Sequence, residues 1–166
     1  HSPLGVGPTR RVRGGRLGGF VCVHGTTVTA SARLDFMNRD FMEALRERVL
    51  VFDGAMGTML QNAGLSLDDY QGKEGCSEIL CVTRPDVVKG IHAAYFEAGA
   101  DAVETNSFGS SAIVLAEYDI ADQVVPLNRL AARLAREVAD DFQADGRPRW
   151  VAGSIGPGTK LPTLGH

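Results

Sequence analysis

The sequence has few cysteines, no long apolar run and little net charge, and each shortage argues against a class of protein. Three cysteines, Cys22, Cys76 and Cys81, cannot all pair with one another, which argues against a disulfide framework and favours a reducing, cytoplasmic location. No uninterrupted apolar segment is long enough to cross a bilayer. The net charge of -3 gives no reason to expect nucleic acid or an anionic membrane as a partner.

The composition that remains is that of an ordinary globular protein. The 166 residues are 44% hydrophobic and 22% charged, which is enough for one domain with its own core. Residues 1–35 differ from the rest because they are rich in Gly, Arg, Thr and Pro and lack a helical period. We interpret them as a flexible leader with one short extended piece around 20–23. The chain begins with His1 rather than Met, so we expect a fragment or a translated upstream extension rather than a natural start.

Short apolar segments alternate with helical periodicity from residue 36 onward. Three strands are predicted, at 49–52, 102–104 and 150–155. An amphipathic helix is predicted before the first strand, and further helices at 111–118 and 121–142. Another helix is predicted to open near Thr83, as its cap, and to end at Gly99. The resulting βαβαβ pattern indicates the α/β class with parallel strands.

Two ways of closing such a sheet remain open from the pattern alone. One is a doubly wound open sheet and the other is a (βα)8 TIM barrel. A full barrel needs about 250 residues, and three strands cannot close one. If the barrel is correct, this chain is a partial barrel of about the first three βα units.

Each predicted strand ends in polar or glycine-rich residues. The first strand ends in Asp53 and Gly54, the second runs into 104–106, and the third runs into Ser154. In a parallel barrel these ends face the same mouth, so two carboxylates and an amide would converge on one cleft. Such a set suits an amino-acid ligand, since carboxylates bind its ammonium group and backbone N–H groups bind its carboxylate. The alternative is that Asp53 and Glu104 only cap the helices that follow them.

Four motifs resemble those of a known family. They are VFDGAMGT at 51–58, AAYFEAGAD at 93–101, ETNSF at 104–108 and VAGSIGP at 151–157. In this order and spacing they resemble the N-terminal homocysteine-binding domain of cobalamin-dependent methionine synthases, within the homocysteine S-methyltransferase family. The resemblance runs from about Phe41 to His166, and residues 1–35 lie outside it. We therefore assign 36–166 to the N-terminal part of a homocysteine-binding barrel domain.

The resemblance implies an enzyme that transfers a methyl group from methylcobalamin to the homocysteine thiol and gives methionine. By position, Asp53 would bind the substrate amino group, the backbone of the next two residues would line the pocket, and 104–106 would shape its mouth. The substrate-binding residues implied in this way are Asp53, Gly54, Ala55, Glu104, Thr105 and Asn106.

The resemblance also implies cofactors and partners outside this chain. The family binds zinc through cysteine thiolates on late strands, and none of the three cysteines occupies such a position. We expect no zinc or cobalamin bound to this fragment, no catalytic residue in it, and no methyltransferase activity from it alone. The expected partners are homocysteine, the remaining half of the barrel, and the cobalamin and folate domains of the parent protein.

Two other functions fit the residues. The first is a self-standing βαβ binding module without catalysis, which would be monomeric and unfold cooperatively, whereas part of a barrel would aggregate or melt diffusely. The second is another barrel enzyme that uses Asp53 and Glu104 as acid and base. Cys76 and Cys81 could form half of a metal site, but partner ligands are not evident. His92 on a predicted helix is interpreted as a helix-surface or packed side chain rather than a ligand.

Overall fold

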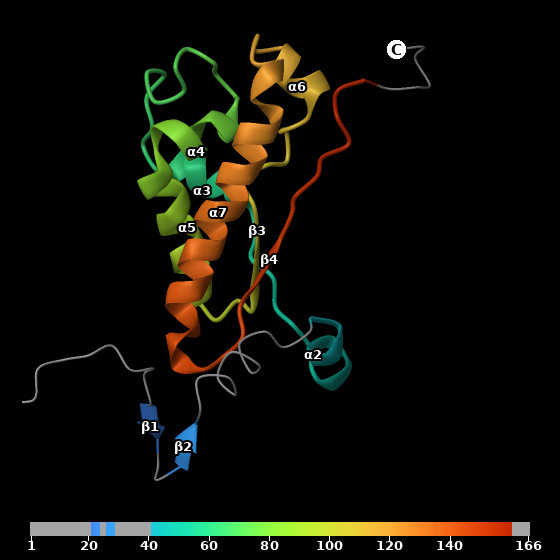
Figure 1. Cartoon of the computed structure of the whole chain (residues 1–166). Coiled ribbons are helices and arrows are strands. Elements are labelled where there is room, and N and C mark those ends of the chain that lie inside the picture. Colours follow the sequence, from blue (N-terminus) through green and yellow to red (C-terminus); the bar gives the residue numbers. More distant parts are fainter. Residues whose placement is uncertain (1–20, 24–25, 29–40, 161–166) are drawn as a thin grey trace, which may run out of the picture.

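The computed structural model describes residues 21–23, 26–28 and 41–160, which are coloured in Figure 1. The rest of the expected leader, the residues just before 41 and those after 160 lie outside this part. Strand β1 (Val21–Val23) pairs antiparallel with β2 (Thr26–Val28), with Cys22 opposite Thr27. The extended piece predicted around 20–23 is therefore confirmed for the three residues that are described.

A short parallel sheet lies at the centre of the remaining chain. Strand β3 (Ala102–Glu104) pairs in parallel with β4 (Trp150–Ala152), and Val103 lies opposite Val151. The predicted strand at 49–52 is reduced to one parallel bridge between Phe52 and Ala102. The ladder does not extend further because side chains take the next N–H group at each end. The Asp101 carboxylate accepts the N–H of Val51 at 3.0 Å, and the Asp53 carboxylate accepts that of Glu104 at 3.0 and 3.1 Å. The order across the sheet is thus Phe52, β3, β4.

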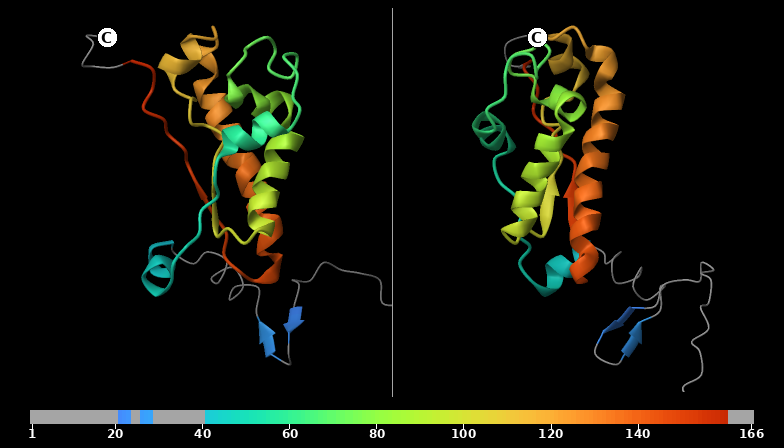
Figure 2. Two further views of the ribbon diagram at one scale, coloured as in Figure 1. Left: turned by 180° about the vertical axis from the view of Figure 1, so that it is seen from behind. Right: turned by 90° about the vertical axis from the view of Figure 1, so that its left-hand side faces the viewer.

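Two long helices lie side by side against one face of this sheet, as Figure 2 shows. Helix α5 (Pro85–Glu97) precedes β3, and helix α7 (Val124–Phe142) precedes β4. Proline at the first position suits a helix start, because its missing N–H would have no intrahelical acceptor there. The predicted cap at Thr83 is wrong: this residue ends helix α4 (Leu80–Thr83), and its hydroxyl donates back to the Ile79 carbonyl at 3.3 Å.

The other helical segments are short and connect these elements. They are α2 (Phe41–Glu47), α3 (Met56–Asn62), η1 (Ser77–Ile79), α6 (Ala112–Ala116), η2 (Ala121–Gln123) and η3 (Gln143–Asp145). The predicted helix at 111–118 is thus shorter in the structure, and the one at 121–142 begins as a 3-10 turn. None of the helices in the described residues has the length and apolar character needed to span a membrane.

The core forms where α5 and α7 meet the sheet and the shorter helices. One cluster joins α3, α4, α5 and α7 through buried side chains such as Leu60, Leu80 and Leu134. A second lies under the sheet and includes Phe96 and Val103. His92 on α5 is fully buried, and burial lowers its pKa to about 4. It is neutral and packed, in agreement with the interpretation of this histidine as part of the core.

The amino ends of the strands are held by an ion pair and by aromatic rings. Asp101 is 2% exposed and accepts two hydrogen bonds from the Arg48 guanidinium, at 2.7 and 2.8 Å. These bonds hold the pKa of Asp101 below its usual range. On the other face, the ring of Phe41 in α2 packs edge-on against Phe52 and Trp150, with centroid distances of 6.1 and 5.7 Å.

Candidate functional site

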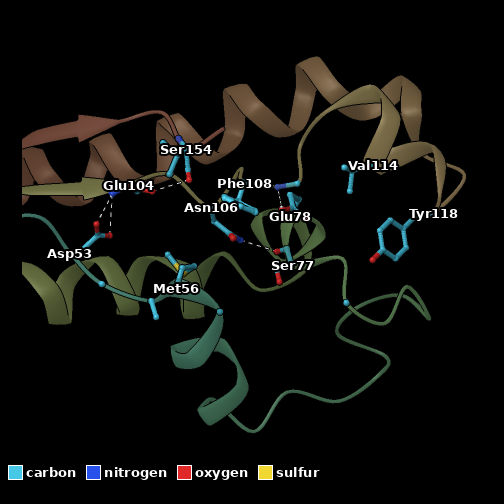
Figure 3. A pocket seen from close by; sticks show the side chains of 16 residues that line it. Asp53, Met56, Ser77, Glu78, Glu104, Asn106, Phe108, Val114, Tyr118 and Ser154 are labelled. Carbon is cyan, nitrogen blue, oxygen red and sulfur yellow. Dashed lines mark hydrogen bonds between the residues drawn. The ribbon is translucent and has the colours of Figure 1, made fainter. Parts of the chain in front are cut away.

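A cavity of about 400 Å³ lies at the carboxyl ends of the strands (Figure 3). This volume falls within the range of about 300 to 1,000 Å³ that is usual for small-molecule sites. Its wall contains all six site residues predicted from the sequence, together with Ser154. The lining residues are Asp53, Gly54, Ala55, Met56, Gly57, Gly75, Ser77, Glu78, Glu104, Thr105, Asn106, Phe108, Gly109, Val114, Tyr118 and Ser154.

Asp53 is placed at the cavity by the bridge that Phe52 makes to β3. Its two carboxylate oxygens share the backbone N–H of Glu104, at 3.0 and 3.1 Å. Burial raises the pKa of Asp53 to about 6; the nearby Glu104 carboxylate adds to this rise, and the hydrogen bond from the Glu104 N–H opposes it. Within the described residues, no lysine or arginine contributes to this shift. Asp53 is therefore an acid without a cationic partner in its surroundings.

Backbone donors lie next to this carboxylate. Within the part of the chain that the structure describes, the N–H groups of Gly54 and Ala55 donate to no protein acceptor. The backbone of Gly54 also lies close to helix α5, because a Cβ at this position would approach the Tyr95 hydroxyl to 3.1 Å. Two free N–H donors and one carboxylate therefore lie together on the cavity wall.

Glu104 connects the ends of the two strands. It is the last residue of β3, and its Oε2 accepts a hydrogen bond from the Ser154 hydroxyl at 2.9 Å. Neither Glu104 nor Asp53 caps a helix: Ala55 is the N-cap of α3 and has no side-chain bond, and the Ser111 hydroxyl caps α6. The capping alternative is thus wrong for both carboxylates.

The rest of this rim is held by hydroxyl and amide groups. Ser154 donates its N–H to the Thr105 hydroxyl at 3.1 Å, and the Ser107 hydroxyl donates to the Ser154 carbonyl at 2.9 Å. Because the Ser107 proton is used in this way, Thr105 is the donor in the 2.7 Å bond between the two hydroxyls. Asn106 donates its amide to the Ser77 carbonyl at 2.8 Å. Thr105 and Asn106 therefore build the wall through bonds within the protein.

Glu78 is the main wall residue that the sequence analysis missed. It is 6% exposed, and its Oε1 accepts the Gly109 N–H at 2.6 Å. Glutamate is rarely buried unless it is paired, so its position before the apolar pair Ile79 and Leu80 did not indicate burial. Its partner is 31 residues away in the sequence, so no local pattern could have identified the contact.

The cysteines at this end do not fit a zinc site. Cys76 and Cys81 are buried free thiols, and burial raises the pKa of Cys81 to about 11. Zinc binds the thiolate form and usually takes four ligands. Among residues 41–160 and the two short strands before them, no group of three or more His, Cys, Asp or Glu side chains is arranged to bind a metal.

Comparison with known proteins identifies the family. The model of the family described as homocysteine S-methyltransferase matches residues 50–165, which is most of the chain. The chain belongs to the homocysteine S-methyltransferase family. The family predicted from the four motifs is thus confirmed.

Two proteins that are similar to this chain are methionine synthases. The chain is 58% identical over 127 residues to methionine synthase of Mycobacterium tuberculosis and 55% identical over 139 residues to that of Mycobacterium leprae. These matches cover 76% and 84% of the chain but only 11% of the length of each relative. The chain therefore corresponds to a small part of proteins that are much longer.

The fold resembles solved structures of a homocysteine methyltransferase. The homocysteine methyltransferase MmuM from Escherichia coli, in its oxidized form, matches with a TM-score of 0.59 and 26% identity. That match covers 71% of this chain and 41% of MmuM. The metallated form of MmuM matches with a TM-score of 0.57 over 69% of the chain. The likeness confirms that this chain has an α/β fold.

Proposed function

We propose that residues 36–166 form the N-terminal part of a homocysteine-binding (βα)8 barrel, comprising about its first three βα units, and that residues 1–35 lie outside it. The longer protein would be a methionine synthase-like enzyme that methylates the homocysteine thiol to give methionine. The relatives named methionine synthase support this, because the chain matches a small part of each. The parallel order of Phe52, β3 and β4 supports this, because a barrel begins with neighbouring parallel strands joined by helices.

One observation supports homocysteine binding. Asp53, which has no cationic partner among the described residues, lies in the same cavity as the two backbone N–H groups that have no acceptor there. The carboxylate of Asp53 binds the ammonium group of the amino acid. The N–H groups of Gly54 and Ala55 bind its carboxylate, while Glu104, Thr105 and Asn106 shape the mouth of the cavity. A free α-amino acid carries its ammonium and carboxylate groups on the same carbon, so the two kinds of group in the site match that end of homocysteine. The side chain with the thiol has no assigned partner among them.

The methyl transfer itself needs groups that we assign to other parts of the longer protein. In the family that the sequence resembles, zinc activates the thiol and methylcobalamin supplies the methyl group. The described residues do not fit zinc, so we derive no step through either cofactor. We propose that the remaining half of the barrel and the cobalamin and folate domains are the partners of this chain, which is inactive alone.

The free thiols of Cys76 and Cys81 support a cytoplasmic location.

The role of Asp53 is tested by titrating the 166-residue chain with L-homocysteine in a calorimeter under reducing conditions at pH 7.5. Asp53→Asn keeps an acceptor for the Glu104 N–H but removes the negative charge. We expect the affinity to fall by about tenfold or more, the value of one charge-assisted hydrogen bond. The thermal midpoint should not fall, since the charged form of Asp53 is disfavoured by burial in the folded chain.

The matched control is Asp141→Asn, which makes the same chemical change on an exposed residue of α7 outside the cavity. It should leave the affinity unchanged. Equal binding by the Asp53→Asn variant and the unsubstituted chain would refute the assignment of Asp53. An unsubstituted chain that does not bind homocysteine at millimolar concentrations would refute the proposed function.

A further inference from the structure

We propose that Glu78 is a positioning residue of the cavity: its buried carboxylate fixes residues 105–110, here named the β3 loop, as the wall of the site. The effect of Glu78 on the geometry of this loop is independent of any ligand. Its effect on homocysteine affinity rests on the proposed function. Glu78 is thus argued to act through the loop and not by contact with the reacting atoms.

The carboxylate of Glu78 is committed to the β3 loop. Its Oε1 accepts the Gly109 N–H at 2.6 Å, while its Oε2 has only the Cys76 thiol, at 3.8 Å, as a neighbouring donor. A buried carboxylate is costly unless donors compensate for the lost water. A hydrogen bond to an ionised acceptor is about twice as strong as a neutral one. The bond from Gly109 is therefore the dominant compensation for burying this charge.

The fit between the two residues is steric as well as electrostatic. A Cβ at position 109 would lie 2.8 Å from the Glu78 Oε1 and 3.2 Å from its carboxyl carbon. Only glycine allows the backbone to approach so closely. The neighbouring residue of η1 makes a second bond to the same loop, because Asn106 donates its amide to the Ser77 carbonyl (Figure 3). Turn η1 therefore holds the β3 loop at two points.

The opposite side of the loop is attached to the segment after β4. Gly156 donates its N–H to the Phe108 carbonyl at 2.9 Å, and Ser107 donates to the Ser154 carbonyl at 2.9 Å. The loop is thus held between η1 and residues 154–156. Among these contacts of the loop, only the one to Glu78 involves a side chain that can carry a full charge. Loss of that carboxylate should release the loop locally, at Gly109. The bonds of the loop to Ser77, to Asn128 of α7 and to residues 154–156 remain.

Substitutions separate positioning from a direct effect of charge on the ligand. Glu78→Ala removes both the acceptor and the charge, whereas Glu78→Gln removes the charge and keeps an oxygen for Gly109. The control is Ile79→Val, a buried apolar change on the same turn at a residue outside the cavity wall. It lowers local stability without altering any hydrogen bond of the loop.

Two measurements on the 166-residue chain form the test: amide hydrogen exchange of the β3 loop without ligand, and calorimetric titration with L-homocysteine. In Glu78→Ala, we expect protection of the Gly109 amide and homocysteine affinity each to fall by about tenfold. Glu78→Gln should lie between this variant and the unsubstituted chain in both, because its bond is neutral. Ile79→Val should lower the thermal midpoint and leave both quantities unchanged.

Two results would overturn the proposal, and a third would separate it from the proposed function. Unchanged Gly109 protection in Glu78→Ala would overturn it. Glu78→Gln with unchanged exchange but an affinity as low as that of Glu78→Ala would also overturn it, since the charge would then act on the ligand directly. If the unsubstituted chain does not bind homocysteine but exchange follows the expected order, the proposed function fails and the positioning of the loop stands. Should Glu78→Ala not fold, Gly109→Ala tests the same contact, and we expect it to expose the loop amides.

Discussion

Two aspartates at opposite ends of the same short sheet differ in what compensates their charge. Asp101, at the amino end, has the Arg48 guanidinium bound to both carboxylate oxygens, and these bonds lower its pKa. Asp53, at the carboxyl end, shares one backbone N–H, and burial raises its pKa to about 6. The cation for Asp101 is part of the chain, whereas no lysine or arginine of the described residues contributes to the pKa of Asp53. A perturbed acid in a cavity without such a partner is a candidate functional residue, in line with the role proposed for Asp53.

The surroundings of the two aspartates differ in the same way. At the amino end, aromatic rings pack edge-on against one another. Arg147 also lies 3.7 Å from Asp101, so the charge of this aspartate is balanced by cations of the chain itself. At the carboxyl end, hydroxyl, amide and backbone N–H groups surround an open cavity. The amino end therefore contributes stability, and the carboxyl end is available for binding. This division is usual in parallel βα structures.

The largest effect is expected from a substitution that removes the ion pair at the amino end of the sheet. Asp101→Ala removes the two carboxylate acceptors of Arg48, which keeps only the Val49 carbonyl, and it leaves the N–H of Val51 without its acceptor. We expect the free energy of unfolding to fall by about 3 kcal/mol, as measured by urea denaturation. At a temperature where the variant is folded, its homocysteine affinity should match that of the unsubstituted chain.

The control for that experiment is Asp141→Ala, an exposed aspartate on α7 whose loss should change the free energy of unfolding by less than about 0.5 kcal/mol. A loss of homocysteine affinity in folded Asp101→Ala would show that the two ends are not independent. That result would contradict the division of the sheet into an end that stabilises the fold and an end that binds the ligand.

The pH dependence of stability should have opposite signs for the two aspartates. The pKa of Asp53 is raised from 3.8 to about 6, so the folded chain binds the extra proton and the Asp53 contribution to stability falls as pH rises from 4 to 6. The pKa of Asp101 is lowered, so its contribution is complete above about pH 4 and is lost at lower pH. Each is measured as the difference between the unsubstituted chain and its Asn variant during denaturation at several pH values.

Differences between variants are needed because His92 titrates in the same range. Its pKa is lowered to about 4 by burial, so its contribution to stability is lost as pH falls below about 6.5. This contribution cancels in each difference. A stability difference for Asp53→Asn that is flat between pH 4 and 6 would show that Asp53 has an ordinary pKa. Homocysteine affinity should rise through the same range, because only ionised Asp53 attracts the ammonium group.

The smallest effect is expected at the contact between the strand ends. Ser154→Ala removes the hydroxyl that donates to Glu104 but keeps the backbone bonds of residue 154. We expect a loss of about 0.5 kcal/mol in the free energy of unfolding and about a twofold loss of homocysteine affinity. Ser66→Ala is the control, because it removes a similar exposed bond, to Asp69, outside the cavity. If both variants bind homocysteine equally well, the hydroxyl of Ser154 has no part in the site.

The sequence was sufficient to predict the order of elements and the residues at the strand ends. Alternation of apolar segments with helical periods placed β3, β4, α5 and α7, and the parallel pattern implied that Asp53, Glu104 and Ser154 lie at one rim. These features depend on local composition and on one rule for parallel strands. They could therefore be found without knowledge of packing.

Features that depend on contacts between distant residues could not be predicted in this way. The segment at 49–52 resembles a strand locally, but the Asp101 and Asp53 carboxylates take the N–H groups of Val51 and Glu104 and limit pairing to one bridge. Thr83 is a residue type that often caps helices, but α4 extends to it and its hydroxyl bonds locally, to the Ile79 carbonyl. Glu78 was missed because its partner Gly109 lies 31 residues later, beyond α4, α5 and β3. In the first and third cases a tertiary bond decides the outcome.

Glu104 has a consequence beyond its own contacts. Its main chain donates to Asp53, and its carboxylate accepts from Ser154, so one residue links the chain on both sides of β3. Asp53, Glu104 and Ser154 are therefore joined in one chain of hydrogen bonds across the carboxyl end of the sheet. A substitution that shifts any one of them would strain the bonds of the other two.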